Sequence, residues 1–374
     1  MRAAVLHELH TPLRLEEVDV DEPKLGEVMV RIAASGICGS DIHVMHGRAN
    51  IGLSMPIVLG HEGAGVVESV GPGVTDLRRG DRVIVSMGSP CGRCEYCGRG
   101  RMQFCNGNPP NATFGQMDDG GYRLSQGGAP VYSFVGIGSL GEYAVVRRRK
   151  LVKFDLDAPF ESLCLISCGV TTGLGAVFNC AEVTPGSSVL VFGCGGIGLS
   201  IIQGAKIAGT AKIIAVDNNA AKLDLAANFG ASHGIVSPED PKALVAEVRK
   251  IAPHGVDYAF DAVGARPERI QELMALTDLG GLTVAVGVLG ATDIVPVSGG
   301  DLLYAARRVT GVRGGNGYPG LDIPRILDLY RAGRLKLDEL VGATYGLDDI
   351  DAAIADAERA THGRVVVRMA PSLL

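Results

Sequence analysis

Four cysteines lie close together in the stretch SPCGRCEYCGRGRMQFC, which spans residues 89–105. Cys91, Cys94 and Cys97 are each three residues apart, and Cys105 follows eight residues later. Four thiolates at this spacing suit a tetrahedral zinc ion that is closed to solvent, and a closed site cannot activate a substrate. We therefore expect a structural site. An iron–sulfur cluster is the main alternative, followed by a redox-active cysteine pair.

The remaining cysteines include candidates for a second, open metal site. Cys38 lies in SGICGSDIHVMHG, His61 lies in VLGHEGAGVV and Cys168 lies in ISCGVTTGLGA. Two thiolates and one imidazole would form the three-ligand set of a catalytic zinc with an open fourth position. Spacing alone does not select these residues, because a lone cysteine or histidine is more often a core or surface residue. Three further cysteines are interpreted as small buried hydrophobic residues: Cys164, Cys180 and Cys194.

A glycine-rich turn, GCGGIG, lies between an apolar strand at 188–192 and a helical pattern at 199–209. This context predicts a dinucleotide-binding loop, in which the glycines allow a tight turn, a close approach of the pyrophosphate and close packing of helix on strand. The alternative is a purely structural glycine turn. The loop residues expected to bind the cofactor are Gly193, Gly195, Gly196 and Gly198.

Asp217 ends the next predicted strand, 19 residues after Gly198. Its carboxylate can accept hydrogen bonds from a ribose diol, and its charge would repel a 2′-phosphate. The sequence therefore favours NAD over NADP.

The elements that must position these residues change character near residue 186. The first 150 residues consist of short strands separated by glycine and proline, which indicates an irregular all-β region. After residue 186, strands and helices alternate, which indicates a parallel sheet with helices on both faces. Strands are expected at 212–217, 256–264 and 282–288, and helices at 220–230, 324–333 and 348–359.

Composition excludes several classes of protein. The chain has 374 residues and a net charge of −6, which argues against a nucleic-acid-binding surface. A basic run at 147–150 is interpreted as a solvated strand end. The opening residues lack the apolar segment of a secretory signal, and the uncharged stretch at 186–205 divides into strand, turn and helix. We expect a cytoplasmic protein with reduced thiols and no membrane partner.

Five segments in order, GICGSD, GHEGAGVV, the four-cysteine run, SCGVTTG and GCGGIG, resemble the zinc-dependent medium-chain alcohol dehydrogenases (medium-chain dehydrogenase/reductase family). The resemblance covers nearly the whole chain. It implies an α/β chain with a GroES-like catalytic domain at 1–165 and 311–374, carrying both zinc sites, and a Rossmann NAD-binding domain at 166–310. The stretch between Cys105 and Cys168 is similar to the long-loop liver-type branch, which suggests a homodimer.

The resemblance also implies roles for individual residues. Cys38, His61 and Cys168 would hold the catalytic zinc, and Cys91, Cys94, Cys97 and Cys105 the structural one. The proton of the alcohol would pass from Ser40 through the nicotinamide ribose to His43 and then to solvent. Asp41 and Glu62 would orient His61, and Glu62 would also bind the zinc transiently. The further cofactor contacts would be Thr172, Lys222, Val288 and Arg364.

Gly39 follows the first ligand, where several relatives carry a basic residue that contacts the pyrophosphate. Two alternatives follow: the affinity for the cofactor is weaker, or Arg364 takes more of that role. Cys168 argues against the polyol dehydrogenases of the family, which usually lack this ligand. We expect NAD-dependent conversion of a primary alcohol to an aldehyde and the reverse. The alternatives are a thiol-adduct formaldehyde dehydrogenase, a zinc-free quinone or enoyl reductase, and a zinc-ribbon protein with a nucleotide-sensing domain.

Overall fold

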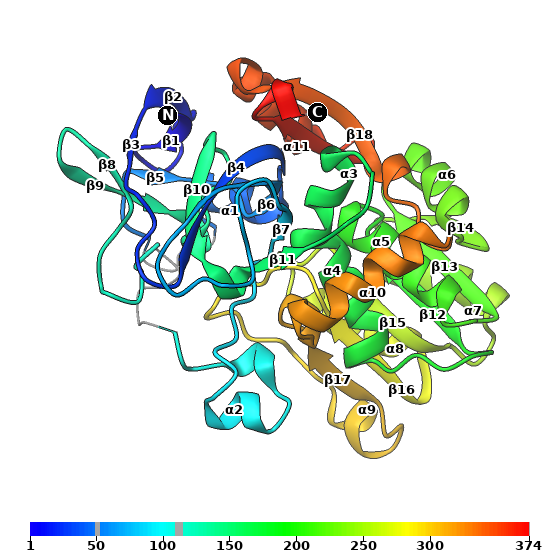
Figure 1. Cartoon of the computed structure of the whole chain (residues 1–374). Helices are drawn as coiled ribbons and strands as arrows, with labels where there is room; N and C mark the ends of the chain where they lie inside the picture. The colour runs from blue at the N-terminus through cyan, green and yellow to red at the C-terminus, as the bar shows by residue number, and fades with distance from the viewer. Residues whose placement is uncertain (49–52, 109–114, 374) are drawn as a thin grey trace. The chain divides into compact units, whose positions relative to one another are not determined.

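The computed structural model describes residues 1–48, 53–108 and 115–373, which form two compact units (Figure 1). Each unit is described by itself. Unit 1 consists of Met1–Gly169, Gly317–Gly333 and Leu337–Leu374, and unit 2 consists of Val170–Asn316 and Arg334–Lys336.

Unit 1 is built mainly from two β-sheets. The first has the strand order β2-β1-β5-β9-β8-β3, and the second has the order β11-β7-β6-β4-β19-β18 with β10 paired to β4. The strands of the first sheet are β1 (Arg2–Leu6), β2 (Arg14–Glu17), β3 (Asp19–Val20), β5 (Ile57–Val58), β8 (Leu124–Gln126) and β9 (Ala129–Ser133). The strands of the second are β4 (Glu27–Gly36), β6 (Glu62–Val70), β7 (Arg82–Val85), β10 (Tyr143–Arg147), β11 (Leu151–Lys153), β18 (Val341–Gly346) and β19 (Arg364–Arg368).

Strand β4 is the centre of the second sheet, because β6, β10 and β19 all pair with it. Nine of its ten residues are buried, so the strand is covered on both faces. Its apolar side chains join those of the neighbouring strands in one core, which includes Val30, Ile32 and Val67. This rigid strand ends at Gly36, two residues before Cys38, and so fixes the start of the segment that carries the first candidate ligand.

Short helices complete unit 1. They are α1 (Gly39–Met45), α2 (Glu95–Gly98), α3 (Phe160–Leu163), α10 (Pro319–Arg331) and α11 (Ile350–Arg359), with 3₁₀ turns that include η1 (Met102–Phe104), η4 (Arg148–Lys150) and η5 (Cys164–Ser167). The predicted start of α10 at Pro324 is wrong. The helix begins at Pro319, where a proline costs nothing because the first helical N–H has no intrahelical partner, and it continues through Pro324.

Unit 2 contains a six-stranded parallel sheet with the order β14-β13-β12-β15-β16-β17. The strands are β12 (Ser188–Phe192), β13 (Lys212–Asp217), β14 (His233–Val236), β15 (Val256–Asp261), β16 (Thr277–Ala285) and β17 (Arg308–Gly311). The helices are α4 (Gly169–Gly175), which begins at the unit boundary, α5 (Gly196–Ile207), α6 (Ala220–Phe229), α7 (Pro241–Ile251), α8 (Glu268–Leu276) and α9 (Gly299–Leu303). The prediction of an α/β fold with a parallel sheet is confirmed.

Successive side chains of β12 point to opposite faces of this sheet, and helices cover both faces. Leu190 and Phe192 pack in a core with Leu244 of α7 and Leu273 of α8. The residues between them point to the opposite face, where Val191 lies beside α5. Because both faces are covered, the strand reads as a continuous apolar run in the sequence.

The interpretation of the basic run at 147–150 as a solvated strand end is wrong. Arg147 and Lys150 are 2% and 3% exposed, and Arg148 and Arg149 are half-buried. Each of the four side chains donates hydrogen bonds to other segments of unit 1. The sequence did not show that the run is buried, because the groups that accept its hydrogen bonds are distant in the sequence.

Among the described residues, no single helix has the length and apolar character needed to cross a membrane. Two short helices, Phe160–Ser167 and Gly169–Cys180, pass that test only when they are joined across a 53° bend.

Candidate active site

Four buried side chains converge in unit 1. Cys38, His61, Glu62 and Cys168 each offer one metal-ligating atom, and these atoms lie within 4.8 Å of one another. They come from three separate segments: the N-cap of α1, the start of β6 and the turn between η5 and α4. The structure thus brings together all three residues that were expected to hold the catalytic zinc.

Asp41 organises this group through three polar contacts. Its Oδ2 accepts a hydrogen bond from the backbone N–H of Cys38 at 3.0 Å, and its Oδ1 accepts one from the N–H of Gly60 at 3.0 Å. The same Oδ1 lies 3.3 Å from Nδ1 of His61. Asp41 is fully buried, so one carboxylate fixes the segments that carry Cys38 and His61.

The environment of His61 is suited to a metal ion. Asp41 engages Nδ1, whereas Nε2 is buried and has no hydrogen-bond partner among the described residues. A buried polar atom without a partner is costly, and a metal ion would satisfy it. With Nδ1 held by a carboxylate, Nε2 is left as the ligand atom, which is the usual arrangement of metal-binding histidines. The donor set of two thiols and one imidazole therefore fits zinc.

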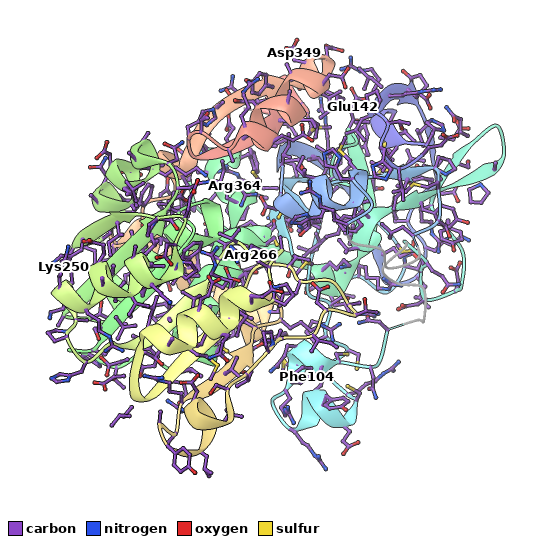
Figure 2. The ribbon with its side chains drawn as sticks, turned by 180° about the vertical axis from the view of Figure 1, so that it is seen from behind. Phe104, Glu142, Lys250, Arg266, Asp349 and Arg364 are labelled. Atoms are coloured by element: carbon purple, nitrogen blue, oxygen red, sulfur yellow. The ribbon has the colours of Figure 1, made fainter. Side chains whose placement is uncertain are left out.

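Glu62 is shared between this group and Arg364. Its Oε1 accepts a hydrogen bond from the N–H of Gly169 at 3.1 Å, and its Oε2 accepts one from Nη2 of Arg364. Arg364, which is labelled in Figure 2, comes from β19 and also donates to the carbonyl of Ile37 at 2.9 Å. Arg364, predicted to bind the cofactor, thus lies against the metal-ligating group within unit 1.

Two glycines make room for the Glu62–Arg364 pair. A Cβ atom at Gly36 would lie 2.3 Å from Oε2 of Glu62, and one at Gly169 would lie 2.5 Å from Nη1 of Arg364. A side chain at either position would therefore displace Glu62 or Arg364, so glycine is favoured there by space and not by backbone freedom. Sequence reasoning missed this role, because Gly36 lies 26 residues before Glu62 and Gly169 lies 195 residues before Arg364.

The ionisation of these groups is strongly perturbed. A hydrogen bond from the Cys168 thiol lowers the pKa of Cys38 well below its ordinary value, and the neighbouring His61 lowers it further against the effect of burial. Burial raises the pKa of Glu62 to about 7, although the charge of Arg364 opposes this shift. A thiol that loses its proton readily is the form that binds a metal ion.

Ser40 and His43 lie on α1, at positions i and i+3 of the helix, and so share one face. The Ser40 hydroxyl is 3.7 Å from Sγ of Cys38. His43 is half-buried, and its Nδ1 has no hydrogen-bond partner in the described part of the chain. Burial lowers the pKa of His43, and the charge of Arg48 lowers it further.

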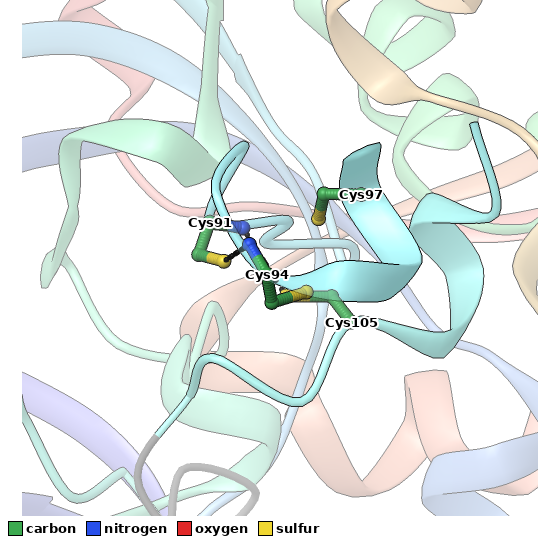
Figure 3. A group of neighbouring side chains, drawn as sticks. All are labelled: Cys91, Cys94, Cys97 and Cys105. Carbon is green, nitrogen blue, oxygen red and sulfur yellow. Dashed lines mark hydrogen bonds between the residues drawn. The ribbon is translucent and has the colours of Figure 1, made fainter. Parts of the chain in front are cut away.

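The four-cysteine run forms the second group, in which four Sγ atoms lie within 4.8 Å of one another (Figure 3). We call residues 89–108 the cysteine lobe. Its only helices are α2 and η1, of four and three residues, and Cys97 is its only buried residue. All nine cysteines of the chain are free, so disulfides do not hold the lobe together.

Backbone N–H groups point at the sulfur atoms of the lobe. The N–H of Cys91 donates to Sγ of Cys105 at 3.2 Å, and the N–H of Cys94 donates to Sγ of Cys91 at 3.3 Å. Hydrogen bonds from the N–H groups of Cys97 and Asn106 lower the pKa of Cys94 to about 6. Such donors stabilise thiolates, and four thiolates without a histidine fit a closed zinc site.

The dinucleotide loop of unit 2 follows β12 and leads into α5. Gly193 has φ +95°, and a Cβ at Gly198 would lie 1.8 Å from the carbonyl oxygen of Gly193. Gly195 is the N-cap of α5, and a Cβ there would meet no atom within 4 Å. The loop thus has the tight turn and close helix packing expected of Gly193 and Gly198, with free space over Gly195. Gly196, the fourth predicted loop residue, opens the helix.

Asp217 ends β13 and faces this loop. Its Oδ2 accepts a hydrogen bond from the N–H of Cys194 at 2.8 Å, and its Oδ1 accepts one from Asn219 at 3.0 Å. Nζ of Lys222 lies 4.0 Å from Oδ2. The other two predicted cofactor residues of unit 2 are in less direct positions: Thr172 is buried on α4, and Val288 is 44% exposed beyond the end of β16.

Phe134 is a site residue that sequence reasoning missed. Its ring packs edge-on against the imidazole of His61, with the ring centroids 5.4 Å apart. Nothing in the spacing of the sequence links position 134 to position 61. Of the unassigned cysteines, Cys164 and Cys194 are buried as expected, whereas Cys180 is only half-buried.

Comparison with known proteins gives the family. The alcohol dehydrogenase GroES-like domain matches residues 24–156, and the zinc-binding dehydrogenase domain matches residues 196–332. The NDMA-dependent alcohol dehydrogenase of Amycolatopsis methanolica is 37% identical over 372 residues, which is 98% of either chain. The chain belongs to the zinc-dependent medium-chain alcohol dehydrogenases. As a member of this family it is an oxidoreductase that acts on alcohols or aldehydes with zinc and a nicotinamide dinucleotide.

Two further relatives match nearly the whole chain. The S-(hydroxymethyl)glutathione dehydrogenase of Synechocystis sp. is 37% identical over 353 residues, covering 94% of this alcohol dehydrogenase and 95% of the relative. The crystal structure of benzyl alcohol dehydrogenase from Acinetobacter calcoaceticus has a TM-score of 0.90 and 32% identity, with 99% of both chains covered. Both matches span nearly whole chains, so the family assignment applies to both units.

Proposed function

We propose that this protein oxidises a primary alcohol to an aldehyde with NAD, and catalyses the reverse reaction, at a zinc ion held by Cys38, His61 and Cys168. The observation that carries the proposal is the buried Nε2 of His61, which has no partner among the described residues and belongs to a group with two thiols. Three ligands leave one coordination position of a tetrahedral metal for substrate.

The bound zinc supplies a Lewis acid that lowers the pKa of the alcohol hydroxyl, and NAD supplies the hydride acceptor. The residues of the chain orient these groups and move the proton. Asp41 holds the ring of His61, and Ser40, whose hydroxyl lies near Cys38, accepts the proton of the alcohol. His43 receives it one helical turn away and releases it to solvent. Its lowered pKa keeps the ring neutral near pH 7, which is the form that accepts a proton.

Glu62 and Arg364 are proposed to control the charge beside the metal. Glu62 is within ligating distance of the group but is also paired with Arg364 and with the backbone of Gly169. Glu62 would therefore be restrained beside a metal held by Cys38, His61 and Cys168, and it could bind that metal transiently while substrate or water exchanges. In the cysteine lobe we propose a second, closed zinc bound by the four thiolates of Cys91, Cys94, Cys97 and Cys105.

The preference for NAD rests on Asp217. The carboxylate accepts a hydrogen bond from the loop residue Cys194, which supports a role in recognising the ribose diol; a 2′-phosphate there would meet its negative charge. Lys222 lies close enough to share the ribose. Glycines 193, 195, 196 and 198 form the loop for the pyrophosphate, and Thr172, Val288 and Arg364 are proposed as further cofactor contacts.

Two relatives are named after their substrates, and both names favour a primary alcohol as the substrate of this protein. Benzyl alcohol and S-(hydroxymethyl)glutathione both carry a CH₂OH group, although they differ in everything else. The second of these names supports one alternative, a dehydrogenase that acts on the adduct of formaldehyde with a low-molecular-weight thiol.

We also propose a homodimer formed through β17. This strand is the last of its sheet, and all four of its residues are exposed. The adjoining α9 exposes Leu302 and Leu303, with Tyr304 directly after it, at 50%, 73% and 86%. An exposed edge strand with apolar neighbours is suited to pairing with the same edge of a second copy across a two-fold axis. Sedimentation analysis should show a dimer, and a monomer at micromolar concentration would contradict it.

The catalytic proposal is tested by following NADH absorbance with aliphatic, aromatic and allylic primary alcohols. Each substrate is assayed with NAD, with NADP and with NDMA as acceptor, and formaldehyde is assayed with and without glutathione. We expect turnover of simple primary alcohols with NAD and without thiol. Turnover that requires glutathione would favour the alternative, and turnover with NDMA alone would contradict the use of exchangeable NAD.

A matched pair of cysteine variants ties this activity to the metal group. Cys168→Ser removes a proposed ligand and should lower kcat/KM by roughly 100-fold or more, because the metal is bound less tightly and its charge is altered. Cys164→Ser changes a buried cysteine outside the group, four residues earlier, and should leave kcat/KM within about threefold. Equal effects of the two substitutions would contradict the proposed ligand set.

A further inference from the structure

The cysteine lobe has a single buried residue. Of residues 89–108 only Cys97 is buried, so the lobe has no hydrophobic core that could fix its shape. Within it, the rings of Tyr96 and Phe104 pack at 6.1 Å, and Arg101 lies over Phe104, yet Tyr96 is 36% exposed. The shape of the lobe therefore depends on the proposed metal and on polar contacts with residues outside the lobe.

Arg149 contacts both ends of the lobe. Its Nε donates to Oγ of Ser89 at 2.9 Å, two residues before Cys91, and its Nη2 donates to Oδ1 of Asn108 at 3.1 Å, three residues after Cys105. Its Nη1 and Nη2 also donate to the carboxylate of Asp118 at 3.0 and 3.1 Å. One guanidinium thus joins the segment that enters the lobe, the segment that leaves it and a residue further along the chain.

A second arginine strengthens this arrangement. Nε of Arg147 donates to Oδ1 of Asp118 at 2.7 Å, and another of its nitrogens donates to the carbonyl of Gln116. Arg147 is the last residue of β10, which pairs with the buried strand β4. Asp118 is therefore fixed to the central sheet, and it in turn holds the planar guanidinium of Arg149 in the orientation that reaches Ser89 and Asn108.

We infer that Arg149 is a positioning residue for the metal of the cysteine lobe. The inference rests on the proposal that the lobe binds zinc. It states that Arg149, which does not bind the ion itself, increases the affinity of the lobe for zinc. By joining residues 89 and 108, Arg149 reduces the number of conformations open to the metal-free lobe. The four thiols then lose less conformational entropy when they bind the ion. A lysine could not do this, because only a guanidinium presents several donors in one fixed plane.

Arg148 provides a matched control, since it belongs to the same basic run and its side chain is as exposed as that of Arg149, at 28%. It pairs with Asp76 and with the carbonyl of Leu151, and it makes no contact with the lobe among the described residues. Replacement of Arg148 therefore removes an equal charge and a comparable ion pair without touching residues 89–108.

The experiment compares Arg149→Met with Arg148→Met in the full-length protein loaded with zinc. Zinc release into a chelator is followed by absorbance, and the cysteines exposed by release are identified by alkylation and peptide mass spectrometry. We expect Arg149→Met to release zinc about tenfold faster, with alkylation at Cys91, Cys94, Cys97 and Cys105, whereas Arg148→Met behaves as the parent protein. Release and alkylation from the Cys38 group should be the same in both variants.

The outcomes separate this inference from the proposal of a lobe zinc. Parent protein whose four lobe cysteines are alkylated at once, with no zinc to release, would refute the lobe zinc itself. A parent protein that retains lobe zinc, with equal release from both arginine variants, would overturn the role of Arg149 alone. If Arg149→Met does not fold, the double variant Ser89→Ala/Asn108→Ala removes the same two contacts with the arginine in place, and the same tenfold change is expected.

Discussion

Replacement of Asp41 by asparagine tests the residue that organises the proposed catalytic metal site. The carboxylate uses both oxygens, because Oδ2 accepts from the N–H of Cys38 and Oδ1 accepts from the N–H of Gly60, each at 3.0 Å. An asparagine side chain has one oxygen and one NH₂ group. Whichever way the amide is turned, its NH₂ must therefore face one of these two buried N–H groups.

The structure sets the size of the expected effect. The substitution removes at least one hydrogen bond to a charged acceptor, which contributes about 1.5–3 kcal/mol, and leaves a buried donor without a partner. It also weakens the contact with Nδ1 of His61, which is 3.3 Å from Oδ1 of Asp41. Because about 1.4 kcal/mol corresponds to a tenfold change, we expect the affinity for zinc at the Cys38 group to fall roughly 10–100-fold.

The assay is a competition between the protein and a chelator of known affinity, with zinc counted by mass spectrometry. Cobalt substitution provides a second readout, since the absorption bands of cobalt report the geometry of its ligands. Asp81→Asn is the control, because Asp81 is also buried, pairs with Lys153 and the N–H of Arg78, and is not one of the metal-ligating residues. Equal zinc affinity and an unchanged cobalt spectrum in Asp41→Asn would refute the reasoning.

Three other substitutions have defined outcomes. Burial lowers the pKa of Lys150 from 10.5 to about 7, so the unfolded chain holds one more proton between these values and stability rises with pH across that window. Lys150→Met should therefore raise the free energy of unfolding by roughly 2–4 kcal/mol at pH 6 and by little at pH 10.5, as measured by denaturant titration; a difference independent of pH would contradict this. Asp217→Ala should raise the KM for NAD about tenfold and reduce discrimination against NADP in steady-state assays, and unchanged discrimination would count against the ribose contact. Gly36→Ala should displace Glu62 and lower the melting temperature by several degrees, which corresponds to about 1–3 kcal/mol. Gly39→Ala is the control and should leave the melting temperature unchanged, because a Cβ atom at Gly39 would meet no atom within 4 Å.

The local signals in the sequence were enough to predict the dinucleotide-binding half. An apolar run at 188–192, a glycine turn and a helical pattern predict a strand, a tight turn and a helix, and the structure has β12, the loop at Gly193 and α5 there. The turn could be predicted because its requirements are local: a positive φ at Gly193 and no room for a Cβ at Gly198. The four-cysteine group is also local, with all its members in one short stretch.

The Cys38 group could not be predicted from local signals, because its members come from three distant segments. Spacing did not select Cys38, His61 and Cys168, and only the resemblance to a family singled them out. Contacts between distant residues also explain what was missed or wrong. Phe134 packs on His61 across 73 positions, and the basic run at 147–150 finds its partners in segments that precede it by tens of residues. No periodicity in the sequence reports such pairs.

The claim that matters most is that one metal ion is bound by Cys38, His61 and Cys168. Anomalous diffraction from crystals of the zinc-loaded protein, recorded on both sides of the zinc absorption edge, tests it directly. We predict a peak in contact with Sγ of Cys38, Nε2 of His61 and Sγ of Cys168, in addition to one among the four sulfur atoms of the cysteine lobe. A peak in the lobe with none beside His61 would contradict the account.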